Sequence, residues 1–159
     1  MKKCFLFLTV LFAVFSCQED VRFNNPAFQG MKDNVLWRAV QSRATVYSGG
    51  ALVVEAFTAT EVVTLKNNTT AVGTYYIGTN ATTTANYEYV NPSTKESIIF
   101  SSGFNVGNGQ IVITKYDPVA MTISGTFKFN LVNTFDNPLV GPTMNFQYGV
   151  FYKVPVSLK

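Results

Sequence analysis

Residues Met121–Val132 alternate between apolar and polar side chains, and this pattern constrains the fold more than any other feature of the chain. The apolar or small set is Met121, Ile123, Gly125, Phe127, Phe129 and Leu131. Because successive side chains of a β-strand point to opposite faces, a period of two predicts a strand with one face in a core and the other in water. Phe127 is therefore expected to point inward and Lys128 outward.

A second segment, Met144–Val156, has the same period. Its expected inward set is Met144, Phe146, Tyr148, Val150, Tyr152, Val154 and Val156, with Phe151 as the exception. Pro155 has no N–H to donate to a neighbouring strand, so this strand is expected to lie at a sheet edge where it ends. Seven weaker candidates are rich in β-branched and aromatic residues: Val35–Val40, Leu52–Phe57, Glu61–Lys66, Thr74–Ile77, Ala85–Val90, Ser97–Phe104 and Gln110–Tyr116.

These segments predict an all-β fold. No stretch of the sequence has a helical stripe, and short loops containing Gly, Asn, Pro and Ser separate the strands, which favours antiparallel hairpins over a parallel sheet. The expected architecture is an antiparallel β-sandwich or a flattened barrel of about nine strands. Trp37, near the start of the first expected strand, is predicted to plug one end of the core.

The N-terminal residues are typical of a secretory signal peptide, because Lys2 and Lys3 precede the apolar run Phe5–Phe15. That run is shorter than the ~20 residues that a membrane-spanning helix needs. The sequence Val14-Phe15-Ser16-Cys17 resembles a bacterial lipobox, in which the Cys is lipidated and becomes the new N-terminus, although Phe15 is bulkier than the usual residue at its position.

The sequence therefore predicts three parts. A lipoprotein signal peptide covers residues 1–16, a lipidated N-terminus and tether covers 17–33, and an antiparallel β domain covers 34–159. The lipid on Cys17 would anchor the protein to the outer membrane. Glu19 and Asp20 follow directly, and they resemble an export signal that places lipoproteins on the cell surface; the alternative is a solvated tether.

Composition excludes several function classes. The chain has no His, and its two Cys are Cys4 and Cys17, so the folded domain has no disulfide and no thiol or imidazole for a metal site. No spaced Asp/Asn loop for calcium is present either, and neither a metal nor a cofactor is expected. Lys and Arg are scattered singly, which argues against a nucleic-acid partner.

An enzyme built from this chain would depend on carboxylates. The expected domain offers Asp33, Glu55, Glu61, Glu88, Glu96, Asp117 and Asp136. A glycosidase needs two carboxyl groups roughly 5 to 10 Å apart. Glu55 and Glu88 lie within expected strands and could meet across a sheet, but a lone Glu on a strand is ordinarily a solvated outward side chain. No catalytic residue is therefore predicted, and the chain is not expected to be an enzyme.

Tyr76 is the candidate binding residue. It is adjacent to Tyr75, so the two side chains must face opposite sides of a strand. An outward Tyr76 would contribute to a sugar- or peptide-binding surface, since an exposed ring offers apolar area with a polar handle. The alternative is that Tyr is simply a good strand residue.

Five blocks carry a resemblance to a known family: Asn25-Pro26-Ala27-Phe28-Gln29, Leu36-Trp37-Arg38-Ala39, Gly73-Thr74-Tyr75-Tyr76-Ile77-Gly78, Gly109-Gln110-Ile111-Val112-Ile113-Thr114 and Ile123-Ser124-Gly125-Thr126-Phe127-Lys128-Phe129. In this order, behind the leader, the chain resembles uncharacterised lipoproteins of Bacteroidetes, chiefly flavobacteria, that carry a domain of unknown function. The resemblance implies a cell-envelope location and an all-β fold, but no activity.

The expected function is a non-catalytic binding or structural module of the cell envelope. Its partners would be the membrane, through the lipid anchor, and an envelope protein or a glycan. The alternative is a carboxylate-dependent hydrolase that acts on glycans.

Overall fold

The computed structural model describes residues 27–159, which form eleven β-strands and no helix. The strands are β1 (Phe28–Lys32), β2 (Val35–Arg38), β3 (Gln41–Val46), β4 (Leu52–Phe57), β5 (Glu61–Asn67), β6 (Gly73–Ile77), β7 (Thr84–Val90), β8 (Ser97–Ser101), β9 (Asn108–Asp117), β10 (Thr122–Val132) and β11 (Thr143–Leu158). Within this part of the chain, no helix is long and apolar enough to cross a membrane. The expected all-β class is confirmed, with eleven strands in place of about nine.

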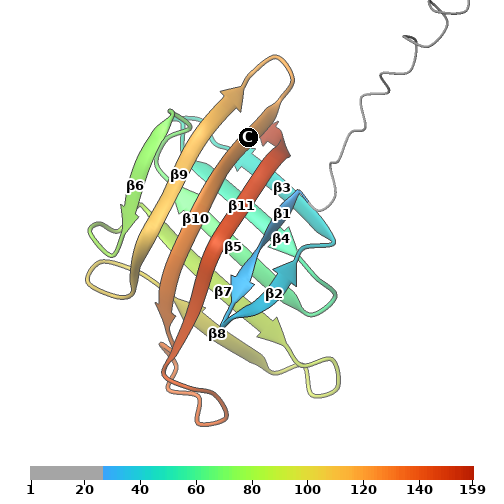
Figure 1. Cartoon of the computed structure of the whole chain (residues 1–159), viewed down its shortest axis with the longest axis vertical. Helices are drawn as coiled ribbons and strands as arrows, with labels where there is room; N and C mark the ends of the chain where they lie inside the picture. Colours follow the sequence, from blue (N-terminus) through green and yellow to red (C-terminus); the bar gives the residue numbers. More distant parts are fainter. Residues whose placement is uncertain (1–26) are drawn as a thin grey trace, which may run out of the picture.

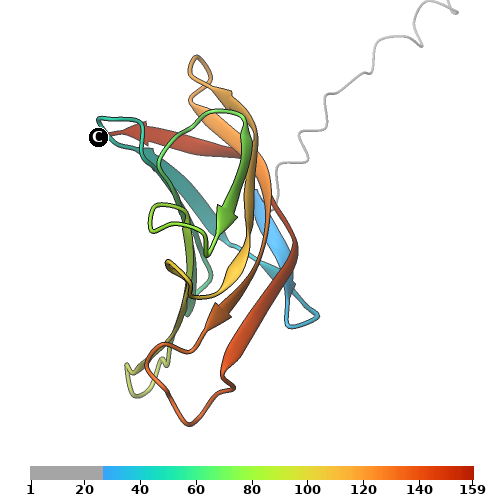
Figure 2. The same ribbon diagram turned by 90° about the vertical axis from the view of Figure 1, so that its left-hand side faces the viewer.

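The strands form one sheet in the order β2-β1-β11-β3-β4-β5-β7-β8-β10-β9-β6, and β10 also pairs with β11. Every pairing is antiparallel except that between β11 and β3, so the sheet is mostly antiparallel, as expected. The sheet turns back on itself (Figures 1 and 2). We call β6, β9, β10, β11, β1 and β2 the front half, and β3, β4, β5, β7 and β8 the back half.

The core lies between the two halves and is rich in phenylalanine. The ring centroids of Phe28 and Phe127 are 4.7 Å apart, and those of Phe129 and Phe146 are 5.1 Å apart. The back half contributes smaller side chains to the same cluster, among them Val54, Val63 and Leu65. Burial of these apolar side chains is the main source of stability for a domain without disulfides.

The alternation predicted for Met121–Leu131 is confirmed over most of β10, since Phe127 is buried and Lys128 is exposed, whereas Ser124, expected on the water face, is buried. Two glycines make room for the rings of this core. A Cβ at Gly149 would lie 2.5 Å from the Phe127 ring, and a Cβ at Gly125 would lie 2.3 Å from Cζ of Phe151. Only glycine lets these rings pack directly on the neighbouring strand.

The face assignment of Met144–Val156 is wrong over the middle of β11. Tyr148 and Tyr152 are exposed, whereas Phe151 is fully buried. Two bulges cause the change, because the register of β11 on β10 shifts between Phe127 and Phe129 and again between Ile123 and Gly125. Each bulge adds one residue to β11, which reverses the face of the residues that follow.

Positive φ angles mark both bulges of β11. Tyr148 has a φ of 52° and Lys153 a φ of 48°. At the second bulge the backbone N–H of Lys153 donates to the Ser124 hydroxyl at 2.8 Å, so a side chain from β10 takes up a donor that the disrupted ladder leaves free. A strict period of two cannot detect such insertions.

The edge position expected for the last strand is also wrong. β11 lies inside the sheet, with β10 on one side and β1 and then β3 on the other. Its pairing with β1 ends at Phe151 and its pairing with β3 begins at Val156. Pro155 lies between these two stretches, where one partner strand has ended and the next has not begun. Pro155 is therefore tolerated because no strand pairs with β11 on this side at that position, although β11 is not an edge strand.

The sheet begins before the expected domain boundary at residue 34, because β1 starts at Phe28 within the segment assigned to the tether. Phe28 is fully buried and belongs to the core. β3 is the other strand that the sequence did not predict. Both strands are short and partly polar, so neither has a clear alternation of apolar and polar residues. Both pair with β11 in the sheet.

Candidate binding surface

Glu61 lies at the start of β5 and points inward, where it joins the two halves of the sheet. Its Oε1 accepts hydrogen bonds from Lys32 Nζ of β1 and from the Tyr87 hydroxyl of β7. Its Oε2 accepts from Trp37 Nε1 of β2 at 2.8 Å and from the Thr58 hydroxyl at 3.3 Å. Lys32 Nζ also donates to the Tyr87 oxygen at 2.9 Å. We call these five residues the Glu61 network.

The surroundings of Glu61 hold it in the charged state. Burial acts to raise the pKa of its carboxyl group, but hydrogen bonds from Lys32, Tyr87 and Trp37 outweigh burial and lower the pKa. Burial, followed by the contact with Glu61, raises the pKa of the Tyr87 hydroxyl, which therefore stays protonated and donates. A carboxylate with both oxygens engaged has no lone pair directed at a substrate, so this arrangement suits a structural role. Trp37 is buried here and packs edge-on against Phe28 and Phe146.

Glu55 and Glu88, the carboxylates considered together from the sequence, lie two strands apart. On β5, Thr64 is the partner of Glu55 and Val62 is the partner of Glu88, so a whole strand separates the two glutamates. Strand spacing and rise place their Cα atoms about 12 Å apart. Each side chain also has a partner of its own: Arg43 Nε donates to Glu55 at 2.8 Å, and the Ser97 hydroxyl donates to Glu88 at 2.7 Å.

The remaining acids do not assemble a metal site. Asp117 accepts the backbone N–H groups of Val119 and Ala120 in the β9–β10 turn, as an Asp beside a proline turn is expected to do. The Ala120 bond, followed by the hydrogen bond from Lys115, lowers the pKa of this carboxyl group. Across residues 27–159, no three Asp, Glu, His or Cys side chains lie close enough together to hold a metal ion.

The outer surface of the front half carries a row of side chains across four strands. Tyr76 of β6 pairs with Gln110 of β9, and Gln110 pairs with Lys128 of β10. Lys128 lies opposite the bulge of β11, which presents Gln147 and Tyr148. We call these five residues the tyrosine row; from β6 to β11 it extends about 14 Å. Tyr76 is 58% exposed and Tyr148 is 83% exposed, so both rings are available to a ligand.

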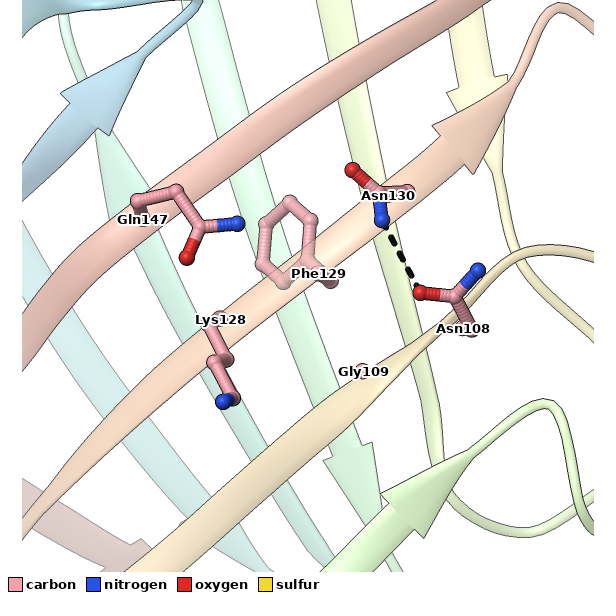
Figure 3. A pocket seen from close by; sticks show the side chains of 6 residues that line it. All are labelled: Asn108, Gly109, Lys128, Phe129, Asn130 and Gln147. Atoms are coloured by element: carbon pink, nitrogen blue, oxygen red, sulfur yellow. Dashed lines mark hydrogen bonds between the residues drawn. The ribbon is translucent and has the colours of Figure 1, made fainter.

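A shallow depression of about 180 Å³ lies beside the row (Figure 3). It is lined by Asn108, Gly109, Lys128, Phe129, Asn130 and Gln147. Asn130 Nδ2 donates to Asn108 Oδ1 at 2.9 Å, and this pair faces Gln147 across the depression. Ligand pockets are usually larger, at about 300 to 1,000 Å³, so this depression suits one group of a ligand that extends along the surface.

Glycine at position 109 is needed beside the depression. A Cβ there would lie 2.2 Å from the Lys128 carbonyl oxygen and 2.6 Å from Cα of Phe129. The φ of Gly109 is +146°, which disfavours other residues as well.

Residues 24–155 match the model of a protein family described as a domain of unknown function (DUF6252). The chain belongs to this family. The match confirms the resemblance to a family that carries an uncharacterised domain, while a Bacteroidetes lipoprotein origin stays a prediction. No curated protein and no solved structure matches the chain.

The bulge in β11 of this DUF6252 domain gives the tyrosine row its second ring. Simple alternation assigned Tyr148 to the core, and the bulge turns it outward beside Gln147. The usable signal in the sequence is Gly149, because a glycine inside a strand often marks a bulge or a close approach.

Tyr76 is exposed, and its role in binding stays a prediction. Its ring points outward from the edge strand β6, while the neighbouring Tyr75 packs against the core. The other predicted site residues are Cys17, Glu19 and Asp20, which lie outside the described residues.

Proposed function

We propose that this protein is a lipid-anchored cell-envelope lipoprotein whose DUF6252 domain is a non-catalytic module that binds a glycan through the tyrosine row. The observation that carries the proposal is the row itself: Tyr76 and Tyr148 are exposed at its two ends, and Gln110, Lys128 and Gln147 lie between them.

The chemistry of the row matches that of a sugar chain. An exposed tyrosine ring offers a flat apolar surface for the C–H face of a sugar and a hydroxyl for hydrogen bonding. Glutamine and asparagine amides both donate and accept, as sugar hydroxyl groups require. The surface is shallow and extends across several strands, which favours a chain over a compact small molecule.

The described carboxylates favour binding over hydrolysis. Glu61 has both oxygens engaged inside the fold, and Glu55 and Glu88 each accept a hydrogen bond from a neighbouring strand, Glu55 from Arg43 and Glu88 from Ser97. None of these three residues belongs to the tyrosine row.

The anchor in this proposal is the lipid on Cys17, which follows the leader and Ser16. Glu19 and Asp20 are proposed as the signal that carries the protein from the outer membrane to the cell surface. We also infer that the architecture is a flattened barrel. β10 pairs with β11 of the front half, and its Val132 pairs with Ser101 of β8 in the back half, so β10 links the two halves of the sheet. Cys17→Ser should abolish acyl labelling and detergent partitioning; a wild-type protein with an unmodified N-terminus would contradict the anchor.

Binding can be tested by affinity electrophoresis of the full-length lipoprotein in detergent gels that contain soluble envelope or plant polysaccharides. We expect at least one polysaccharide to retard the wild type, and Tyr148→Ala to lose most of the retardation. Tyr47→Ala is the matched control, because Tyr47 is an exposed tyrosine outside the row. Equal retardation of both variants, or no retardation of the wild type by any polysaccharide tested, would contradict the proposal.

A further inference from the structure

The strands of the front half are almost free of acidic residues. β1, β6, β10 and β11 contain no Asp or Glu, and β9 contains only Asp117 at its end. In the back half, β4, β5 and β7 carry one glutamate each: Glu55, Glu61 and Glu88. The strands that carry the tyrosine row are therefore poor in acidic side chains. Asp33, in the turn between β1 and β2, is an acid of the front half outside its strands, and its carboxylate accepts the backbone N–H of Asn145 of β11.

Two lysines on the same surface have no acidic partner. The ion pairs among residues 27–159 are Lys32–Glu61, Arg43–Glu55 and Lys115–Asp117, which leave out both Lys128 and Lys153. Lys128 and Lys153 are both exposed. Lys153 Nζ lies 5.3 Å from the centre of the exposed Tyr152 ring, so this cation is presented together with an aromatic face.

The two lysines lie along one line of the sheet. Lys153 belongs to the bulge opposite Ser124, four residues before Lys128 on β10. At about 3.3 Å per residue, this separation is about 13 Å. Unpaired cations at this spacing, with tyrosines 148 and 152 beside them, favour a ligand that carries repeated negative charges.

We propose that the ligand of this surface is an acidic saccharide chain, whose carboxylate or sulfate groups bind Lys128 and Lys153 while its rings pack on Tyr148 and Tyr152. This inference rests on the proposed function and specifies its ligand class. The amide of Gln147 lies within the same surface and would bind the neutral hydroxyl groups between the charges.

The test measures binding of the full-length lipoprotein in non-ionic detergent by fluorescence anisotropy. The labelled probes are polygalacturonate oligomers, dextran sulfate, neutral dextran of matched length and polyphosphate. Variants Lys128→Met and Lys153→Met, alone and combined, remove the two cations. Lys66→Met is the matched control, since Lys66 is an exposed lysine on β5 of the back half. Circular dichroism checks that each variant remains folded.

At low salt we expect an acidic saccharide to bind more tightly than dextran. An exposed charge interaction contributes about 0.2–1 kcal/mol, so each single variant should weaken binding up to about fivefold and the double variant about tenfold. Lys66→Met should leave the affinity unchanged, and added salt should reduce the advantage of the acidic probe.

Four results would overturn the inference, and only the last of them would also overturn the proposed function. Dextran binding as tight as that of both acidic saccharides, or no loss in the double variant, would reject the acidic class and leave glycan binding intact. Polyphosphate binding as tight as that of the acidic saccharides would show that charge alone is recognised, without the sugar. No binding of any saccharide would overturn both the inference and the proposed function.

Discussion

The Glu61 network and the tyrosine row are built from similar residues. The polar groups of the network bond one another, whereas the side chains of the row face solvent. Each contains a lysine and at least one tyrosine, and each draws on several strands. In the network, Lys32 and Tyr87 bond each other and Glu61. In the row, Lys128 has no acidic partner within the described chain, and Tyr148 is largely exposed.

This difference indicates what each cluster does. Partly buried polar groups that bond one another hold the two halves of the sheet together, and removing one member leaves the others without partners. Exposed groups without partners contribute little to stability and are accessible for ligand binding. Changes inside the domain should therefore act on the free energy of unfolding, and changes on the front surface should act on binding.

The largest contrast is expected between two neighbours on β10. Phe127→Ala removes a buried ring that packs on Phe28 and Phe129, and should cost about 3–5 kcal/mol. Lys128→Ala should change the unfolding free energy by less than about 0.5 kcal/mol. Urea denaturation followed by circular dichroism measures both. Equal losses would mean that the faces of β10 are assigned incorrectly.

The next largest effect is expected at the network. Glu61→Ala leaves Lys32, Trp37 and Tyr87 without their common acceptor and should cost about 2–4 kcal/mol. Glu55→Ala is the control, because its ion pair with Arg43 is largely exposed and should contribute at most about 1 kcal/mol. If the two variants unfold at the same urea concentration, the network does not join the halves as described.

Removing a single tyrosine hydroxyl should affect the two clusters differently. Tyr87→Phe removes a hydroxyl that bonds Lys32 and Glu61, and should cost about 1–2 kcal/mol. Tyr148→Phe removes an exposed hydroxyl, and should change stability by less than about 0.5 kcal/mol. Thermal unfolding of the two variants measures the difference. A greater loss in Tyr148→Phe would reverse the roles of the two clusters.

The network should also make stability depend on pH. Because the pKa of Glu61 in the fold lies below its ordinary value of 4.5, its contribution is present above pH 4.5 and is lost as the pH falls through the lower folded pKa. The difference in stability between wild type and Glu61→Gln should therefore shrink below pH 4.5. A difference that stays constant from pH 7 to pH 3 would show that the charge of Glu61 does not contribute.

Regular periodicity made the all-β fold and the face of β10 predictable, since residues 126–131 alternate between buried and more exposed side chains. It failed where the backbone departs from regular pairing. The bulges at Tyr148 and Lys153 reversed the face of β11, and the gap between β1 and β3 placed Pro155 inside the sheet.

The candidate site was predictable only in part. The outward position of Tyr76 follows from its alternation with Tyr75 on β6. Its partners in the row come from strands far apart in sequence, and only the strand order of the sheet places them side by side. The Glu61 network has the same origin, because Lys32 lies on a strand that the sequence did not predict.

Ligand is expected to bind the front half of the sheet and not the back half. Hydrogen–deuterium exchange of the full-length lipoprotein, with and without polygalacturonate, tests it most directly. We expect slower exchange in peptides that cover β10 and β11 around Lys128 and Tyr148, with unchanged exchange in β3, β4 and β5. Protection confined to the back half, or no protection by any saccharide that binds, would contradict it.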